Sequence, residues 1–359
     1  MHDKREATQS GGMNMDFERY GQRILEETAA LLAIDSPSGM TQAAADHVMA
    51  RFEALGYACE RTRKDGVLVH LGGEDAQDGL LLEAHMDTLG GMVCRIKDNG
   101  RLKITNIGGL NPNNVETENC RVVTRGGRVI EGTAQLCNAS IHVNGEYSEE
   151  KRTFDTLEIV LDEDVKNAED VKKLGVRVGD YVCFDPRTRI TESGYIKSRF
   201  LDDKLSVGIL LGYAQYLKDA GITPRRAVYA HITAFEEVGH GGSASVPQGV
   251  TEAIAVDMGC VGEGLDCDEH MVSICAKDRS GPFHYATTNG LIAAAEKMGA
   301  RYAVDVYPYY SSDVATTLRA GNDLRYGLIG AGVYASHGYE RSHVDGAVAA
   351  LKVLAGYIE

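Results

Sequence analysis

The sequence of 359 residues contains no uninterrupted apolar run of about 18 residues, the length that a membrane-spanning helix needs. Its first dozen residues, MHDKREATQSGG, also lack the apolar stretch that is typical of a signal peptide. We therefore expect no membrane span, and we expect residues 1–14 to form a flexible tail.

The eight cysteines form no CxxC pair and are scattered along the chain. This spacing indicates reduced thiols in a cytoplasmic protein rather than a disulfide framework. Positive charge is also scarce, because 37 Lys and Arg stand against 52 Asp and Glu, which gives a formal net charge of -15. Such an acidic chain argues against nucleic acid or an anionic membrane surface as a partner.

The overall composition, with 43% hydrophobic and 25% charged residues, is that of a globular protein. A chain of this length can bury one large core and a second, smaller one. The 41 glycines indicate many tight turns.

The outer parts of the chain alternate between helical and strand-like patterns. Helices are predicted over 15–34, from Thr41 to Gly56, over KLSVGILLGYAQYLKDAG, and near 286–298 and 344–358. Strands are predicted in YACERTR, GVLVHLG, GLLLEAHMD, AVYAHITAF, EAIAVDM, MVSICAK and YAVDVY. This alternation is typical of an α/β domain, which we assign to residues 15–92 and 195–359.

The intervening residues, 93–194, show a different pattern. Short strand-like pieces and turns follow one another, and only DVKNAEDVKKLG is predicted as a helix. We therefore predict a small all-β module inserted into the α/β domain.

Polar side chains that can bind a metal stand at the ends of several predicted strands. His85 and Asp87 are two residues apart and share a face of an extended chain, so that the imidazole and the carboxylate can meet. A ligating histidine usually gives its other N–H to such a carboxylate. The alternative is a histidine at a strand end beside a turn aspartate.

Three further segments carry candidates of the same kind. Asp202 and Asp203 precede a helical run, where one can cap the helix while the other points into a cleft. Asp257 ends an apolar run, so that it is a turn residue or a buried acid that needs a partner or a metal. His337 and His343 lie in a late loop, where either can be a surface residue, and His337 follows the apolar run GLIGAGVYA more closely.

The stretch TAFEEVGHGG places Glu236 and Glu237 side by side between an apolar run and a glycine cluster. Alone, such a pair is most simply a solvated turn. The interpretation changes because the other candidates complete a set of two imidazoles and three carboxylates: His85, Asp202, Glu237, Asp257 and His337. That set suits two divalent ions such as zinc, with one carboxylate bridging them.

Two metals can lower the pKa of a water and clamp a carbonyl oxygen, but the site still needs a base that is not a ligand. Glu237 can bind a metal. Glu236, on the opposite face of an extended chain, would have to be redirected towards the water. We expect a local bend at the strand end, eased by the nearby glycines.

Five short motifs, AHMD, LDDK, EEVG, VDMG and SHG, occur in an order that resembles the glutamyl/tetrahedral aminopeptidase family of dinuclear metallopeptidases. Some members were formerly labelled endoglucanases. Each motif is weak alone, but the combination is specific, and the resemblance covers nearly the whole chain after the tail. It implies an α/β/α sandwich with an inserted β-barrel that serves dimerisation.

The same resemblance implies an enzyme that hydrolyses N-terminal residues from peptides and often assembles as a tetrahedral dodecamer. It implies two divalent ions per chain, zinc first, with cobalt or manganese as alternatives. Asp202 is then the bridging carboxylate. His85 and Asp257 complete one metal site, and Glu237 and His337 complete the other.

By this resemblance Glu236 is the general base and Asp87 orients His85. Two hypotheses stay open beside it: an amidohydrolase that deacylates N-acyl amino acids, and a non-enzymatic assembly protein with a vestigial site. The intact Glu236 argues against the second. A glycosidase needs two carboxylates and no metal, which does not match a set with two histidines.

The sequence departs from the family pattern at two places. Ser311 and Ser312 precede Asp313 in YYSSDVATTLRAG, where the family has a Gly-Thr-Asp loop near the substrate. His240 stands in EEVGHGGS, where the family more often has an apolar residue. Both departures concern the specificity pocket and leave the predicted metal ligands intact.

Overall fold

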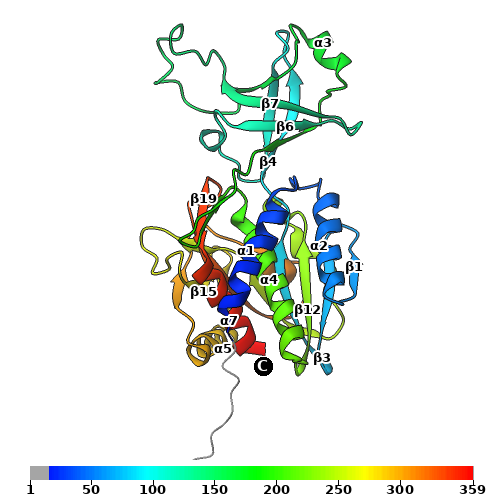
Figure 1. Ribbon diagram of the computed structural model, residues 1–359, viewed down its shortest axis with the longest axis vertical. Coiled ribbons are helices and arrows are strands. Elements are labelled where there is room, and N and C mark those ends of the chain that lie inside the picture. Colours follow the sequence, from blue (N-terminus) through cyan, green and yellow to red (C-terminus); the bar gives the residue numbers. More distant parts are fainter. Residues whose placement is uncertain (1–15, 359) are drawn as a thin grey trace, which may run out of the picture.

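The computed structural model describes residues 16–358, which form a layered α/β part and a smaller β-barrel beside it (Figure 1). The predicted α/β/α sandwich with an inserted barrel is confirmed. In the part of the chain that the structure covers, none of the helices combines the length and the apolar character that crossing a bilayer requires.

A sheet of 13 strands forms the centre of the α/β part, with the main order β1-β2-β12-β3-β13-β18-β19-β11-β10. Strand β14 pairs with β18, and β15 pairs with β16, β17 and β18. The bounds are β1 Cys59–Arg61, β2 Val67–Gly72, β3 Asp75–His85, β10 Arg189–Ile190, β11 Tyr195–Ser198, β12 Arg226–Thr233, β13 Val250–Val256, β14 Gly259–Val261, β15 Val272–Asp278, β16 Gly281–Pro282, β17 Tyr302–Val306, β18 Arg325–Tyr334 and β19 Glu340–His343.

Helices cover both faces of this sheet. Their bounds are α1 Glu18–Leu32, α2 Gln42–Ala54, α4 Leu201–Ala220, α5 Tyr285–Met298, α6 Asp313–Arg319 and α7 Val344–Ile358. Successive residues of β3 point to opposite faces: Leu80 and Leu82 belong to the core that contains α1, α4 and α7, whereas Leu81 packs in a second cluster with Val314 of α6. Burial on both faces explains why this strand is a continuous apolar run.

The insert is a closed six-stranded barrel in the order β4-β5-β8-β7-β6-β9. Its strands are β4 Gly90–Ile96, β5 Leu102–Ile107, β6 Asn119–Val123, β7 Val129–Leu136, β8 Leu157–Leu161 and β9 Tyr181–Phe184, accompanied by α3 Ala168–Lys173 and a 3-10 turn at Pro112–Asn114. At the junction with the α/β part, the buried Arg199 donates to Glu118 Oε2 at 2.6 Å and to the carbonyl of Asn114 at 2.6 Å.

Several local predictions need correction. Thr41 does occupy the N-cap position of α2, but its side chain makes no capping hydrogen bond, and the helix ends at Ala54. The segment that we compared with a loop contains α6, which begins at Asp313. The late loop contains a strand, β19, because residues 340–343 pair with both β11 and β18; His343, its last residue, is therefore buried.

The topology places the ends of three neighbouring parallel strands together. Strand β3 lies between β12 and β13 and is parallel to both, and β3 ends at His85, β12 at Thr233 and β13 at Val256. Ligands bind in open α/β sheets at this carboxyl edge. Here the edge faces the barrel, because β3 leads directly into β4 (Figure 1).

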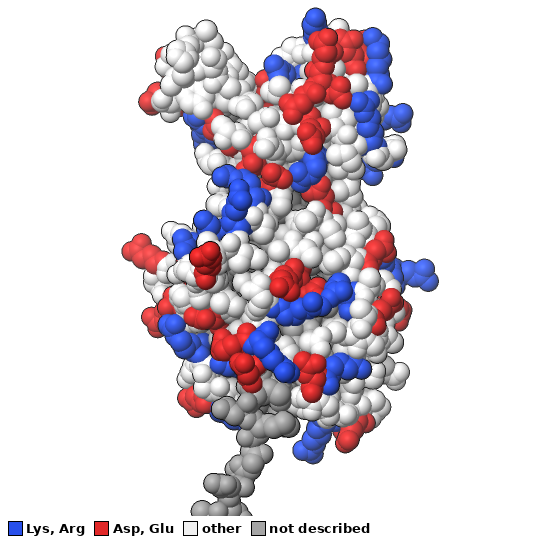
Figure 2. Space-filling view, viewed as in Figure 1, with Lys and Arg blue, Asp and Glu red and all other residues white. Residues whose placement is uncertain are grey.

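The surface charge is spread over both parts of the molecule. On the face shown in Figure 2, acidic and basic side chains are interspersed over the barrel and the α/β part. The formal net charge of -15 is therefore not gathered into one patch on this face.

Candidate metal centre

The carboxylate of Asp202 lies between two imidazoles. His85 Nε2 is 3.1 Å from Asp202 Oδ1, and His337 Nε2 is 3.4 Å from Asp202 Oδ2. Both oxygens of this one carboxylate are therefore engaged, each by a different histidine. This arrangement is what a carboxylate that bridges two ions requires.

Two groups of possible ligands share Asp202. His85, Asp202 and Asp257 form one, and Asp202, Glu237 and His337 form the other; within each group the ligand atoms lie within 4.8 Å of one another. Among the residues described, Oε1 of Glu237 is buried and has no hydrogen-bond partner. A buried carboxylate oxygen left without a partner is costly, so this donor set fits a bound cation.

Asp202 owes its position to an irregular start of α4. Asp202 and Asp203 have non-helical backbone angles within the first turn, the peptide bond between them is cis, and Phe200, not an aspartate, is the N-cap residue. Asp203 accepts the backbone N–H of His85 at 3.1 Å. The first aspartate thus faces the two histidines while the second holds the end of β3.

The two glutamates sit on a bend after β12. The backbone turns at Phe235, which adopts a left-handed conformation with φ 71°, and Glu236–Val238 form one 3-10 turn. The expected bend exists, but Phe235 makes it rather than a glycine; Gly239, with φ 84°, follows the turn. Glu236 Oε2 then lies 3.8 Å from His85 Nε2, on the same side as the ligand groups.

Asp87 contacts the turn that carries the glutamates. Its carboxylate accepts the backbone N–H groups of Glu236 at 3.1 Å and of Glu237 at 3.4 Å, together with the hydroxyl of Ser38. His85 Nδ1 lies 2.9 Å from the backbone oxygen of Asp87 and 3.7 Å from its nearer carboxylate oxygen. Asp87 therefore reaches the imidazole through its backbone and the glutamates through its side chain.

His337 receives its support from the barrel and from β19. Asn114 donates to the backbone oxygen of His337 at 2.8 Å, and a Cβ at Gly109 would lie only 2.6 Å from His337 Nδ1. Glu340 accepts the backbone N–H of His337 at 2.9 Å and that of Asp202 at 3.1 Å. Sequence reasoning missed Glu340, although its place three residues after His337 in SHGYE was the available signal.

Crowding of acids shifts the pKa values in this cluster. Burial raises the pKa of Glu236 well above its ordinary value, and burial also raises that of Asp257 to about 6. Burial opposes ionisation of Asp202 as well, but hydrogen bonds from His337 and His85 bring its pKa below the usual range. A carboxylate with a raised pKa is suited to act as a general base. The negative charge of the cluster as a whole favours a bound cation.

The two segments in which the sequence departs from the family pattern, one before Asp313 and one at His240, lie near this cluster. Asp313 is buried and accepts the N–H of Gly242 at 2.5 Å and the hydroxyl of Thr233. It therefore supports the glycine loop that follows the glutamates. His240 is exposed, and its ring stacks on Phe235 at 4.9 Å.

The Ser311 hydroxyl lies 3.2 Å from that of Ser280, near the surface, whereas Ser312 is buried. Neither serine belongs to the two ligand groups that share Asp202.

Comparison with known proteins agrees with this geometry. The family model described as M42 glutamyl aminopeptidase matches residues 65–353. YhfE of Bacillus subtilis (strain 168), which carries a provisional aminopeptidase name, is 40% identical over 338 residues, 94% of this chain and 98% of its own length.

Two solved structures show the same fold. An aminopeptidase from the archaeon Desulfurococcus kamchatkensis superposes with a TM-score of 0.84 at 22% identity, covering 95% of both chains. The TET1 peptidase of Pyrococcus horikoshii, described as able to assemble into a tetrahedron or a large octahedral shell, gives 0.80 at 20% identity, covering 93% of this chain and 99% of its own.

The chain belongs to the M42 glutamyl aminopeptidase family. It is a metallo-aminopeptidase, an enzyme that hydrolyses peptide bonds. The hypothesis of a non-enzymatic assembly protein is therefore wrong.

The contacts of Asp87 lead to a prediction. We expect Asp87→Asn to lower metal affinity or turnover by roughly 10–100-fold, because an amide NH₂ cannot accept one of the N–H groups that the carboxylate now holds. Zinc titration and peptide hydrolysis measure both effects. Asp98→Asn, at an exposed position in the barrel, is the matched control. Unchanged metal affinity and turnover in the Asp87 variant would contradict this role.

Proposed function

We propose that this enzyme removes residues from the free amino terminus of peptides, with two divalent ions held by His85, Asp202, Asp257, Glu237 and His337. The observation that carries the proposal is the single Asp202 carboxylate shared by two ligand groups, with Glu236 beside them. Two imidazoles and three carboxylates favour zinc, and cobalt or manganese can occupy similar sites. When bound, the ions supply Lewis acidity that lowers the pKa of water and polarises a carbonyl.

Glu236 is the proposed general base. It lies near the ligand groups without belonging to either, so that its carboxylate is available to take a proton from the attacking water and to pass it to the leaving amine. Burial supports this role, since it raises the pKa of Glu236 and makes the carboxylate a stronger proton acceptor. Asp87 holds the turn in place through both backbone N–H groups.

The proposed preference for a free amino terminus follows from charge. Two divalent ions formally balance Glu236, Glu237, Asp202 and Asp257, but the buried Asp87, Asp203 and Asp313 lie near them, so the site holds more carboxylates than two ions neutralise. A substrate ammonium group is favoured near carboxylates that remain unneutralised, while the carbonyl faces the ions. A related deacylase of N-acyl amino acids is the second candidate, because the same ligand set also supports that reaction.

We also propose that residues 15–92 and 195–359 form the catalytic domain and that residues 93–194 form a domain that joins subunits. Support comes from large apolar side chains exposed on the insert, with Ile141 61% and Val143 75% exposed. A related TET1 peptidase forms tetrahedral particles, and we propose a dimer that builds a dodecamer here. The eight cysteines, all between residues 16 and 358, are free thiols, which supports a cytoplasmic location.

The division of labour between the two glutamates is directly testable. Glu236→Gln keeps the shape but removes the base, so turnover should fall by about 10²–10⁴-fold while two metals per chain remain. Glu237→Gln should instead lower the metal content, because Glu237 supplies a ligand oxygen to the second group. Metal analysis of both purified variants measures the difference. Equal metal loss in the two variants would refute the assignment.

Substrate class is tested with a matched pair of short peptides, one with a free amino terminus and one N-acetylated. We expect a strong preference for the free peptide in kcat/KM with zinc or cobalt present, because only that peptide carries the ammonium group. Preference for the acetylated peptide with release of acetate would favour the deacylase instead.

The role of the insert is tested by charge on its apolar surface. The double variant Ile141→Asp and Val143→Asp should give a smaller particle in light scattering, because two exposed apolar side chains become acidic. Val306→Asp, at a position 53% exposed on β17 of the catalytic domain, is the control. An unchanged particle in the insert variant would count against this surface as the subunit contact.

A further inference from the structure

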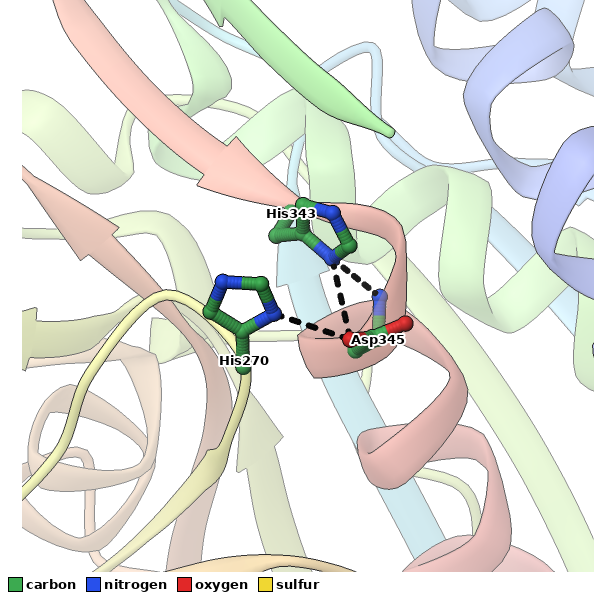
Figure 3. A group of neighbouring side chains, drawn as sticks. All are labelled: His270, His343 and Asp345. Atoms are coloured by element: carbon green, nitrogen blue, oxygen red, sulfur yellow. Dashed lines mark hydrogen bonds and ion pairs between the residues drawn. The ribbon is translucent and has the colours of Figure 1, made fainter. Parts of the chain in front are cut away.

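A third group of side chains that could bind a metal shares no residue with the two groups around Asp202 (Figure 3). His270 lies in the loop before β15, His343 is the last residue of β19, and Asp345 stands in the first turn of α7. β19 runs directly into α7, so His343 and Asp345 are neighbours in the chain, and the fold brings His270 to them. The two rings lie against each other, with centroids 4.0 Å apart, and the Asp345 carboxylate lies to one side, within reach of a nitrogen of each ring (Figure 3).

The spacing of the three groups suits a small divalent ion. Asp345 Oδ2 is 2.8 Å from His270 Nδ1 and 3.3 Å from His343 Nδ1, and the three ligand atoms lie within 4.8 Å of one another. Zinc binds such atoms at about 2.0–2.1 Å, which places tetrahedral ligands roughly 3.3 Å apart. An ion therefore fits with small shifts of the two partly exposed side chains, His270 and Asp345.

The far nitrogen of each ring already has an oxygen partner. His343 Nε2 lies 2.7 Å from the carbonyl oxygen of Ser193, which can only accept, so Nε2 carries the proton. His343 Nδ1 therefore has the lone pair, with which it accepts the backbone N–H of Asp345 at 3.1 Å, and an ion at Nδ1 replaces this hydrogen bond. His270 Nε2 lies 3.1 Å from the Tyr195 hydroxyl, which can accept in the same way. A ligating histidine characteristically donates its other N–H to such an oxygen.

The backbone around the group is closely fitted to it. A Cβ at Gly194, which has φ +88°, would lie 2.6 Å from His343 Nε2. A Cβ at Gly346 would lie 2.5 Å from the carbonyl oxygen of Glu269, in the loop that carries His270. Both glycines allow the loop, β11 and α7 to approach closely enough for the three side chains to meet.

We propose that His270, His343 and Asp345 form a third divalent-metal site, separate from the dinuclear centre, which takes zinc or a similar ion that prefers imidazole. His343 is buried, whereas 29% of the His270 side chain and 46% of the Asp345 side chain are exposed. An ion can therefore enter from solvent, and water can complete its coordination. When bound, it pins the loop before β15 to β19 and α7, which places it in a structural role.

Metal counting tests this site. Protein is saturated with zinc, passed through a desalting column and analysed by elemental mass spectrometry. The wild-type chain should hold three zinc ions and His270→Ala should hold two, since His270 is partly exposed and its loss spares the buried His343. His142→Ala, which removes an exposed histidine of the barrel, should still hold three.

Anomalous diffraction at the zinc edge provides the second measurement, which needs no variant. A peak between His270, His343 and Asp345 in zinc-treated wild-type crystals is the expected result. Two zinc ions per wild-type chain, three in His270→Ala, or no peak between these side chains would each overturn the proposal. The dinuclear centre gives its own peaks beside Asp202. The experiment therefore shows separately whether zinc binds at the dinuclear centre and whether it binds at the third site.

Discussion

The structure depends on one constraint, the concentration of buried carboxylates around Asp202. Asp202 faces two imidazoles, and Asp257, Glu236 and Glu237 complete the negative charge around it. Burial raises the pKa of each of these last three, so the cluster resists full ionisation by itself. Bound divalent ions offset the repulsion between these carboxylates. The clearest sign that a cation belongs here is Glu237 Oε1, which is buried and has no hydrogen-bond partner among the described residues.

The rest of the fold serves to hold this cluster. Three parallel strands end at the same edge of the sheet and deliver His85, the glutamate turn and Asp257. Lys204 of the LDDK motif is buried and donates to the carbonyls of Leu31 at 3.0 Å and Ile34 at 2.7 Å, which ties the start of α4 to the end of α1. The motif thus places a proposed metal ligand, Asp202, two residues before the lysine that anchors the helix.

The barrel contributes to the same cluster. Asn114 donates to the backbone of His337, and Gly109 leaves space for its ring. Arg199, one residue before the irregular start of α4, is paired with Glu118 of the barrel. The insert is therefore part of the wall of the site as well as the proposed subunit contact, so complete excision would remove support from His337.

The sequence predicted what depends on local order and on motifs. The α/β/α fold, the inserted barrel and the family were accessible because apolar periodicity is local and because AHMD, LDDK, EEVG, VDMG and SHG occur in order. The left-handed turn at Phe235 could not be predicted from the sequence, because a bulky residue does not indicate such a turn. Asp87 binding the glutamate turn, and Glu340 joining His337 to Asp202, depend on contacts across long stretches of chain.

The group of His270, His343 and Asp345 was not predicted from the sequence either, because it too depends on contacts between distant parts of the chain. His343 was assigned to a loop because its strand is only four residues long and is stabilised by pairing with β11 and β18. Short strands of this kind have little local signal, and their existence follows from the neighbours that they pair with.

Whether Asp202 bridges two ions is visible in a crystal structure of the metal-loaded enzyme with anomalous data. We expect two anomalous peaks about 3.5–4 Å apart. One oxygen of Asp202 should bind each ion, with His85 and Asp257 on one and Glu237 and His337 on the other. A single peak, or two peaks with Asp202 bound to only one of them, would contradict the bridging role of Asp202.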